Sequence, residues 1–157
     1  MSEDESKNLR ERRGFSLEDK IMVIGFPGIV DISTELIDTV EELYDISKQN
    51  NVLLLLVGDV GKFEYIRIAQ EDNCANIISK NGVLKDYYAI ADLALICGNI
   101  VYSKSHLHNF IEATAGGPLF LVKPEHALQY GYKQLIEREV IRESENTDDL
   151  ISKVKKY

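Results

Sequence analysis

Short apolar runs alternate along the chain with longer segments whose apolar residues recur every three to four positions. The short runs are typical of buried strands, and the longer segments are typical of helices that bury one face. In one such segment, 33–49, Leu36 and Val40 fall on the same helical face, and Ser33 or Thr34 can cap its start. The pattern predicts strands at 20–25, 51–58, 75–79, 92–97, 118–123 and 140–144, and helices at 33–49, 62–72, 84–91, 109–116, 126–139 and from about 148.

The strand at 51–58, NVLLLLVG, is apolar on both of its faces. Such strands belong in the middle of a parallel sheet that helices cover on both sides. About six alternations of strand and helix therefore predict the α/β class, with a Rossmann-like, doubly wound, mostly parallel sheet of about six strands and helices on both faces. Ligands of such sheets bind at the carboxyl ends of the strands. The loops to examine are 25–32, 58–62, 79–83 and 97–109.

The first 13 residues, MSEDESKNLRERR, are mostly charged and lack a hydrophobic face. They are predicted to be a tail or a linker, with a short helix near their end. The regular pattern then runs from 14 to 157, which is a suitable length for a single domain.

Composition and charge narrow the function classes. Apolar residues make up 45% of the chain and the net charge is −8, so we expect a packed core and no broad nucleic-acid surface. The run VLLLLV is too short to cross a bilayer, and residues 1–13 contain no apolar core of a signal peptide. Cys74 and Cys97 are expected to be buried, reduced thiols. These features predict a cytoplasmic protein.

Two glycine-containing loops follow predicted strands. GDVGKF, 58–63, lacks the spacing and the Ser or Thr of an ATP-binding P-loop. It is either a tight turn or a weak anion site to which Lys62 adds charge. GFPGIVD, 25–31, lacks the dinucleotide-binding glycine pattern. Either Pro27 and Gly28 merely shape this loop, or its backbone approaches a ligand closely.

Three histidines raise the question of a metal. His106 and His108 are two positions apart, but no third ligand follows at a recognisable spacing, and His126 begins a later helix. No nucleophile elbow of the G-x-S-x-G type is present in the sequence either. The sequence therefore predicts no metal site, and it identifies no catalytic residue.

The segment HNFIE, 108–112, carries the most informative polar residues. Asn109 and Glu112 have the spacing of a reciprocal helix cap, which predicts a helix that begins at Asn109. His108 then lies just before the helix, at the carboxyl edge of the sheet. Two interpretations stay open. Asn109 and Glu112 either only cap the helix, or the helix start receives an anionic ligand while Glu112 accepts hydrogen bonds from sugar hydroxyls.

The order VLKDYYAIADLALICGNIV…HNFIEATAGGPLFLVKP resembles the C-terminal, donor-binding domain of GT-B glycosyltransferases. Within that superfamily it is most similar to the Kdo (3-deoxy-D-manno-octulosonic acid) transferases, which use a CMP-linked donor. The similarity spans roughly residues 9–155 and is sharpest over 86–124. The resemblance implies a metal-independent glycosyltransferase domain without a cofactor that binds a nucleotide sugar, CMP- or UDP-linked.

The resemblance also implies a site and partners. His108, Asn109 and Glu112 would hold the nucleotide part of the donor, and the loop containing Gly25, Pro27 and Gly28 would line the same cleft, with Lys62 as the weakest candidate. GT-B enzymes react between two halves, so the acceptor-binding half would be a further domain or a partner subunit. The acceptor would be a lipid or a glycan, and peripheral membrane association would come through that partner.

A second hypothesis is a catalytically inactive Rossmann-like module that serves as a protein-interaction or scaffold domain. Tyrosine is enriched at interfaces, so exposed tyrosines would then mark the partner surface. The alternative for the same side chains is ordinary packing against the sheet. The candidates are Tyr87, Tyr88, Tyr102, Tyr130 and Tyr132.

Overall fold

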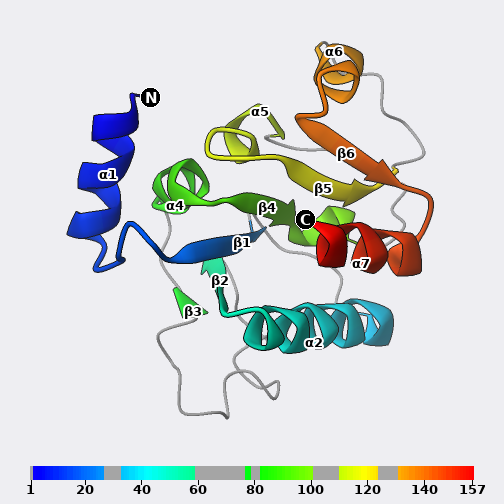
Figure 1. Ribbon diagram of the computed structural model, residues 1–157. Helices are drawn as coiled ribbons and strands as arrows, with labels where there is room; N and C mark the ends of the chain where they lie inside the picture. Colours follow the sequence, from blue (N-terminus) through cyan, green and yellow to red (C-terminus); the bar gives the residue numbers. More distant parts are fainter. Residues whose placement is uncertain (1, 27–32, 59–76, 79–81, 101–109, 124–130) are drawn as a thin grey trace.

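The computed structural model describes residues 2–26, 33–58, 77–78, 82–100, 110–123 and 131–157. Within these residues the centre of the protein is a six-stranded, all-parallel sheet with the strand order β3-β2-β1-β4-β5-β6 (Figure 1). The predicted fold class, a doubly wound Rossmann-like sheet, is confirmed. The strands are β1 (Lys20–Phe26), β2 (Val52–Gly58), β3 (Ile77–Ile78), β4 (Leu93–Ile96), β5 (Leu119–Val122) and β6 (Ile141–Ser144).

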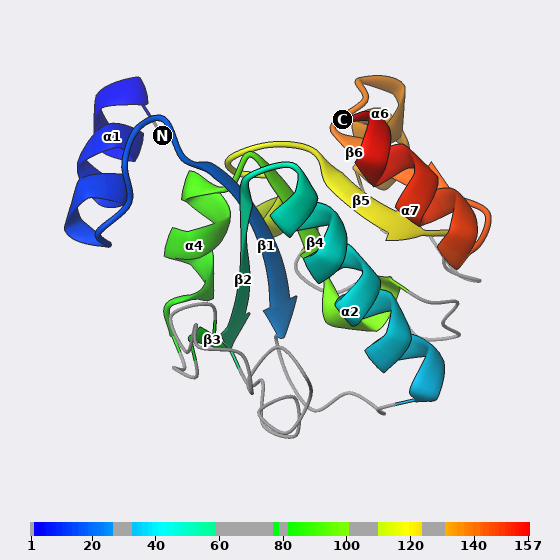
Figure 2. The same ribbon diagram turned by 60° about the horizontal axis from the view of Figure 1, so that its bottom comes forward.

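Helices cover both faces of the sheet (Figures 1 and 2). The apolar layer on one face joins the strands to α2 (Thr34–Gln49) and α7 (Thr147–Lys156). The layer on the other face contains residues of α1 (Glu3–Arg12), α4 (Leu84–Ile90), α5 (Phe110–Ala113) and α6 (Tyr132–Glu137). None of the helices in the described part of the chain is long and apolar enough to span a membrane.

The two layers follow from alternation along the central strands. In β1, Ile21 and Val23 face the α4 layer, whereas Met22 and Ile24 face the α2 layer, and all four are almost completely buried. Successive side chains of a strand point to opposite faces, so a strand buried on both sides must be apolar at every position. This is why β1 and β2 read as continuous apolar runs in the sequence.

Several helix ends agree with the sequence pattern. Ser33 accepts a hydrogen bond from the Leu36 N–H at 3.1 Å and so caps α2, and Asn146 caps α7 in the same way through the Asp149 N–H at 2.9 Å. The final helix therefore begins at Thr147, one residue before the predicted start. Of the helix predicted at 126–139, the structure describes α6, which begins at Tyr132 after Gly131 in a left-handed conformation.

The prediction of a helix through residue 116 was wrong, because α5 ends at Ala113. The reason is the close packing of the next two glycines. A Cβ atom on Gly116 would lie 2.5 Å from the carbonyl oxygens of Tyr88 and Ala91, and one on Gly117 would lie 2.1 Å from the Asp92 carbonyl oxygen. The chain leaves the helix here so that its bare backbone can pass against the junction between α4 and β4.

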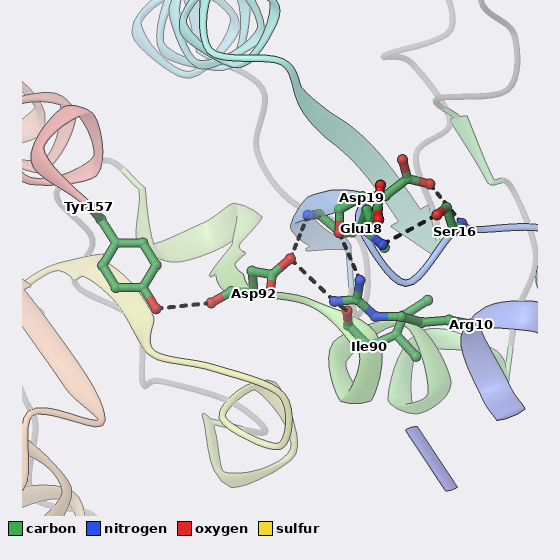
Figure 3. A network of polar contacts seen from close by, with 8 residues as sticks. Arg10, Ser16, Glu18, Asp19, Ile90, Asp92 and Tyr157 are labelled. Atoms are coloured by element: carbon green, nitrogen blue, oxygen red, sulfur yellow. Dashed lines mark hydrogen bonds and ion pairs between the residues drawn. The ribbon is translucent and has the colours of Figure 1, made fainter. Parts of the chain in front are cut away.

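The N-terminal segment is more than the predicted tail or linker, because it forms a docked helix. A capping box at Ser2 and Glu5 starts α1, and Leu9 is buried against the α4 layer. Arg10 donates hydrogen bonds to the carbonyl oxygens of Asp19 and Ile90 at 2.7 and 2.9 Å (Figure 3). It also contacts Asp92, whose carboxylate accepts the Ile21 N–H at 2.8 Å. Arg10 thus links α1 to the beginning of the central strand.

Candidate functional site

The strand order reverses between β1 and β4, and the general rule for doubly wound sheets locates the candidate site at this reversal. β1 pairs with β2 on one side and with β4 on the other, and Gly25 is the register partner of Ile96. Ligands of doubly wound sheets bind beyond the carboxyl ends of the strands at this reversal. β1 ends at Phe26, and β4 is followed by a 3-10 turn, η3 (Cys97–Asn99), that packs on β1. These residues form the floor of the candidate site.

Gly25 lies at this floor, and Tyr88 of α4 lies directly above it. A Cβ atom on Gly25 would come within 1.8 Å of the Tyr88 Oη and 2.9 Å of a Leu84 methyl group. The missing side chain therefore makes room for the phenol, which is 1% exposed. The predicted role of Gly25, close approach of its backbone to a ligand, stays a prediction, and packing against Tyr88 already explains why the position is glycine.

The Tyr88 phenol connects the floor to α5. Burial raises the pKa of Tyr88 well above its usual value, and the negative charge of the Glu112 carboxylate raises it further. Helices α4 and α5 pack against each other, so Tyr88 and Glu112 belong to neighbouring helices. Tyr88 is therefore a neutral hydroxyl group at all physiological pH values.

Helix α5 presents Glu112 at the rim of the site. Phe110 and Ala113 are buried, and the Phe110 ring packs edge-to-face on Tyr132 with centroids 5.9 Å apart. The neighbouring Ile111 is 66% exposed and Glu112 is partly exposed. The buried side chains of Phe110 and Ala113 thus anchor the helix, while the Glu112 carboxylate stays accessible to solvent. Because α5 has only four residues, its dipole is small, and recognition of an anion must depend mainly on individual side chains and N–H groups.

Cys97 begins the turn after β4 and is fully buried. Burial raises the pKa of its thiol to about 12, so at pH 8 the group is a protonated thiol rather than the reactive thiolate. We expect iodoacetamide to leave Cys97 unmodified in the folded protein at pH 8 and to modify it in urea. Peptide mass spectrometry reports each cysteine separately. Rapid modification of Cys97 without denaturant would contradict its placement in the core.

The structure describes two of the seven predicted site residues: Gly25, near the carboxyl end of β1 and packed against Tyr88, and Glu112, on α5, which packs against α4. Sequence reasoning did not single out the packing of Tyr88 against Gly25, and no signal in the sequence reveals that contact. The other predicted site residues lie outside the described residues, namely Pro27, Gly28, Lys62, His108 and Asn109.

The hypothesis of an interaction module expects five exposed tyrosines, and the three that the structure describes are buried. Tyr87, Tyr88 and Tyr132 are 7%, 1% and 4% exposed, because they pack into the α4 layer of the core. Tyr102 and Tyr130 lie outside the described residues. Ordinary packing, the alternative interpretation, is correct for the three that the structure describes.

Within the described residues, no three His, Cys, Asp or Glu side chains lie close enough together to hold a metal ion. All three histidines, at 106, 108 and 126, fall outside that part of the chain. A separate cavity of about 430 Å³ lies at the opposite, amino edge of the sheet. It is lined by residues that include Lys20, Asn50, Asp92 and Tyr157.

Comparison with known proteins supports the fold assignment. No protein-family model matches the chain, and no curated protein does. Among solved structures, WaaG, a glycosyltransferase involved in lipopolysaccharide biosynthesis, superimposes with a TM-score of 0.57 and 18% identity over 99% of this chain and 42% of its own. Anabaena Alr3699/HepE, in complex with UDP-glucose, gives 0.57 and 15% over 99% of this chain and 43% of its own.

WaaG and HepE share the fold of this chain over 99% of its length. The chain spans about two fifths of the length of each neighbour. At 15% and 18% identity the similarity carries the fold and leaves function to be argued from the site.

Proposed function

We propose that this chain is the donor-binding domain of a GT-B glycosyltransferase and that it binds a nucleotide sugar in the β1–β4 crevice. The observation that carries the proposal is the position of Glu112, a partly exposed carboxylate held by an anchored helix beside the reversal of strand order. A similar fold in a structure that contains UDP-glucose supports it. Glu112 accepts hydrogen bonds from hydroxyl groups of the donor, and the neutral Tyr88 phenol supports the floor beneath it.

We further propose which nucleotide the donor carries and which partner completes the reaction site. The motif HNFIE favours a Kdo-transferase-like domain with a CMP-linked donor, whereas the UDP-glucose complex of the similar HepE fold favours UDP. His108, Asn109, Pro27, Gly28 and Lys62 are proposed to contact the nucleotide, without a metal ion. An acceptor-binding domain or subunit supplies the rest of the reaction site, in the cytoplasm, with a lipid or glycan as acceptor.

Thermal denaturation with CMP, UDP and GDP tests this function. A nucleotide at about 100 times its Kd stabilises the folded state by about 2.7 kcal/mol, which raises the Tm of a chain of this size by roughly 5–10 °C. We expect such a shift with CMP or UDP. Glu112→Ala removes a charge-assisted hydrogen bond, so affinity falls at least about tenfold and the shift at the same concentration falls to about half or less.

The matched control is Glu137→Ala, which removes an exposed carboxylate from α6. It should leave the nucleotide shift unchanged. Loss of the proposed cap would lower the Tm of the ligand-free Glu112→Ala protein by an amount equivalent to about 1 kcal/mol, so each shift is measured against the variant's own ligand-free Tm. An undiminished shift in Glu112→Ala would remove this residue from the site.

The second candidate function is the inactive scaffold module. It is favoured by one observation, namely that Tyr88 occupies the space above Gly25 where a ligand would otherwise approach β1. The same titration separates the two functions. If no nucleotide at millimolar concentration changes the Tm, the donor-binding proposal fails and the scaffold function is retained.

A further inference from the structure

Two side chains in the described part of the chain bury a polar atom that has no hydrogen-bond partner there: Asn99, through Nδ2, and Ser144, through Oγ. Asn99 is 3% exposed and Ser144 is 2% exposed, so water does not replace the missing partners freely. Buried polar groups are nearly always paired, and an unpaired one lowers the stability of the fold. Each of the two therefore needs an explanation.

Their positions in the sheet differ. Ser144 ends β6, at the outer edge of the sheet. Asn99 ends η3, the turn that follows β4 and packs on β1, so it lies at the reversal of strand order itself. This is the place where a doubly wound sheet receives its ligand. The turn that carries the unpaired Nδ2 of Asn99 thus lies at the proposed donor site, whereas Ser144 lies on the outermost strand.

We propose that Asn99 is a donor-binding residue whose Nδ2 donates a hydrogen bond to an acceptor oxygen of the bound nucleotide. This inference rests on the proposed function and adds a residue to it. The amide is left unpaired in the ligand-free fold and gains its partner when the nucleotide enters the crevice. The acceptor is an oxygen of either the phosphate or the pyrimidine base, since both present the same hydrogen-bonding chemistry to an amide.

The test is Asn99→Leu, which keeps the approximate shape of the side chain and removes both polar atoms. Removing a buried polar atom that has no partner leaves no other group unpaired and ends the cost of burying it. We therefore expect the ligand-free Tm to stay the same or to rise, while the Kd for UDP or CMP, measured by calorimetry, weakens about 10- to 100-fold. Asn99→Ala, which cannot overpack the turn, should weaken the Kd similarly and serves if the leucine variant does not fold.

Ser144→Ala is the matched control, because it removes the other unpaired buried group. Its ligand-free Tm should also stay the same or rise, but its Kd should remain that of the wild type. Uridine and cytidine, which lack phosphate, identify the acceptor. Weaker binding of both nucleoside and nucleotide assigns Asn99 to the base, and weaker binding of the nucleotide alone assigns it to the phosphate.

The failures of the two proposals are distinguishable. If the wild type binds a nucleotide and the Asn99 variants bind it equally well, the role of Asn99 is overturned and the proposed function stands. A clear drop in the ligand-free Tm of Asn99→Leu with an unchanged Kd also overturns it, since the amide then has a structural partner. If the wild type binds none of the nucleotides, both proposals are overturned.

Discussion

Gly25→Ala is expected to lower the free energy of unfolding by about 3 kcal/mol, although it adds a single methyl group. The new Cβ atom would lie 1.8 Å from the Tyr88 Oη and 2.4 Å from its Cζ, so the ring has to move. Tyr88 is 1% exposed, its aromatic ring is rigid, and it packs in the α4 layer of the core, where close-packed interiors accommodate a displaced ring poorly. Urea denaturation of the wild type and the variant measures the difference.

A double-mutant cycle assigns this loss to Tyr88. Tyr88→Ala is itself destabilising, but in that background Gly25→Ala should cost about 2 kcal/mol less than in the wild type. Gly117→Ala is the comparison, because its Cβ atom would lie 2.1 Å from the Asp92 carbonyl oxygen, a backbone atom that truncation of Tyr88 does not remove. Its cost should therefore be nearly independent of Tyr88. If Gly25→Ala cost less than about 0.5 kcal/mol, Tyr88 would not occupy this space.

Arg10→Ala is expected to destabilise the protein by about 2–3 kcal/mol and to release α1 from the domain. The guanidinium is only 13% exposed and donates to two backbone carbonyl groups that would lose their partner. Its ion pair with Asp92 contributes less, because the Asp92 side chain is 44% exposed and solvent screens the interaction. Hydrogen exchange of the α1 amides should become faster in the variant while that of β1 changes much less.

Arg12→Ala supplies the control for Arg10. Arg12 lies on the same helix, is exposed, and makes none of these contacts. The same substitution there should change the free energy of unfolding by less than about 0.5 kcal/mol. Equal effects of the two substitutions would mean that helix propensity, rather than docking through Arg10, determines the result.

The parts of the fold that sequence could predict depend on local patterns. The continuous apolar runs of β1 and β2 indicate strands that are buried on both faces, and the Ser33 cap can be predicted from the residues that follow it. The end of α5 was not predictable, because Gly116 and Gly117 meet backbone atoms of a segment about 25 residues away. The docking of α1 was missed for a similar reason, since Arg10 reaches Ile90 and Asp92, and nothing in the charged segment itself reveals those partners.

The same distinction between local patterns and contacts of distant residues applies to the candidate site. Glu112 was identifiable from the sequence, because its spacing from Asn109 and its place before an apolar strand form a local pattern. The overlap of Tyr88 with the space above Gly25 depends on residues 63 positions apart, and the unpaired amide of Asn99 is a property of the packed structure. The sequence therefore directed attention to the carboxyl edge of the sheet, whereas the packing of Tyr88 over Gly25 emerges only from the structure.

The most direct test of the account is where a nucleotide binds on the protein. Backbone amide NMR spectra recorded during titration with UDP and with CMP report the position of binding residue by residue. We predict that the largest shifts fall at the ends of β1 and β4 and in α5, including Phe26, Asn99 and Glu112, while α7 and β6 change little. Shifts confined to the amino edge around Asn50 and Tyr157, or no shifts at millimolar nucleotide, would contradict a donor site in the β1–β4 crevice.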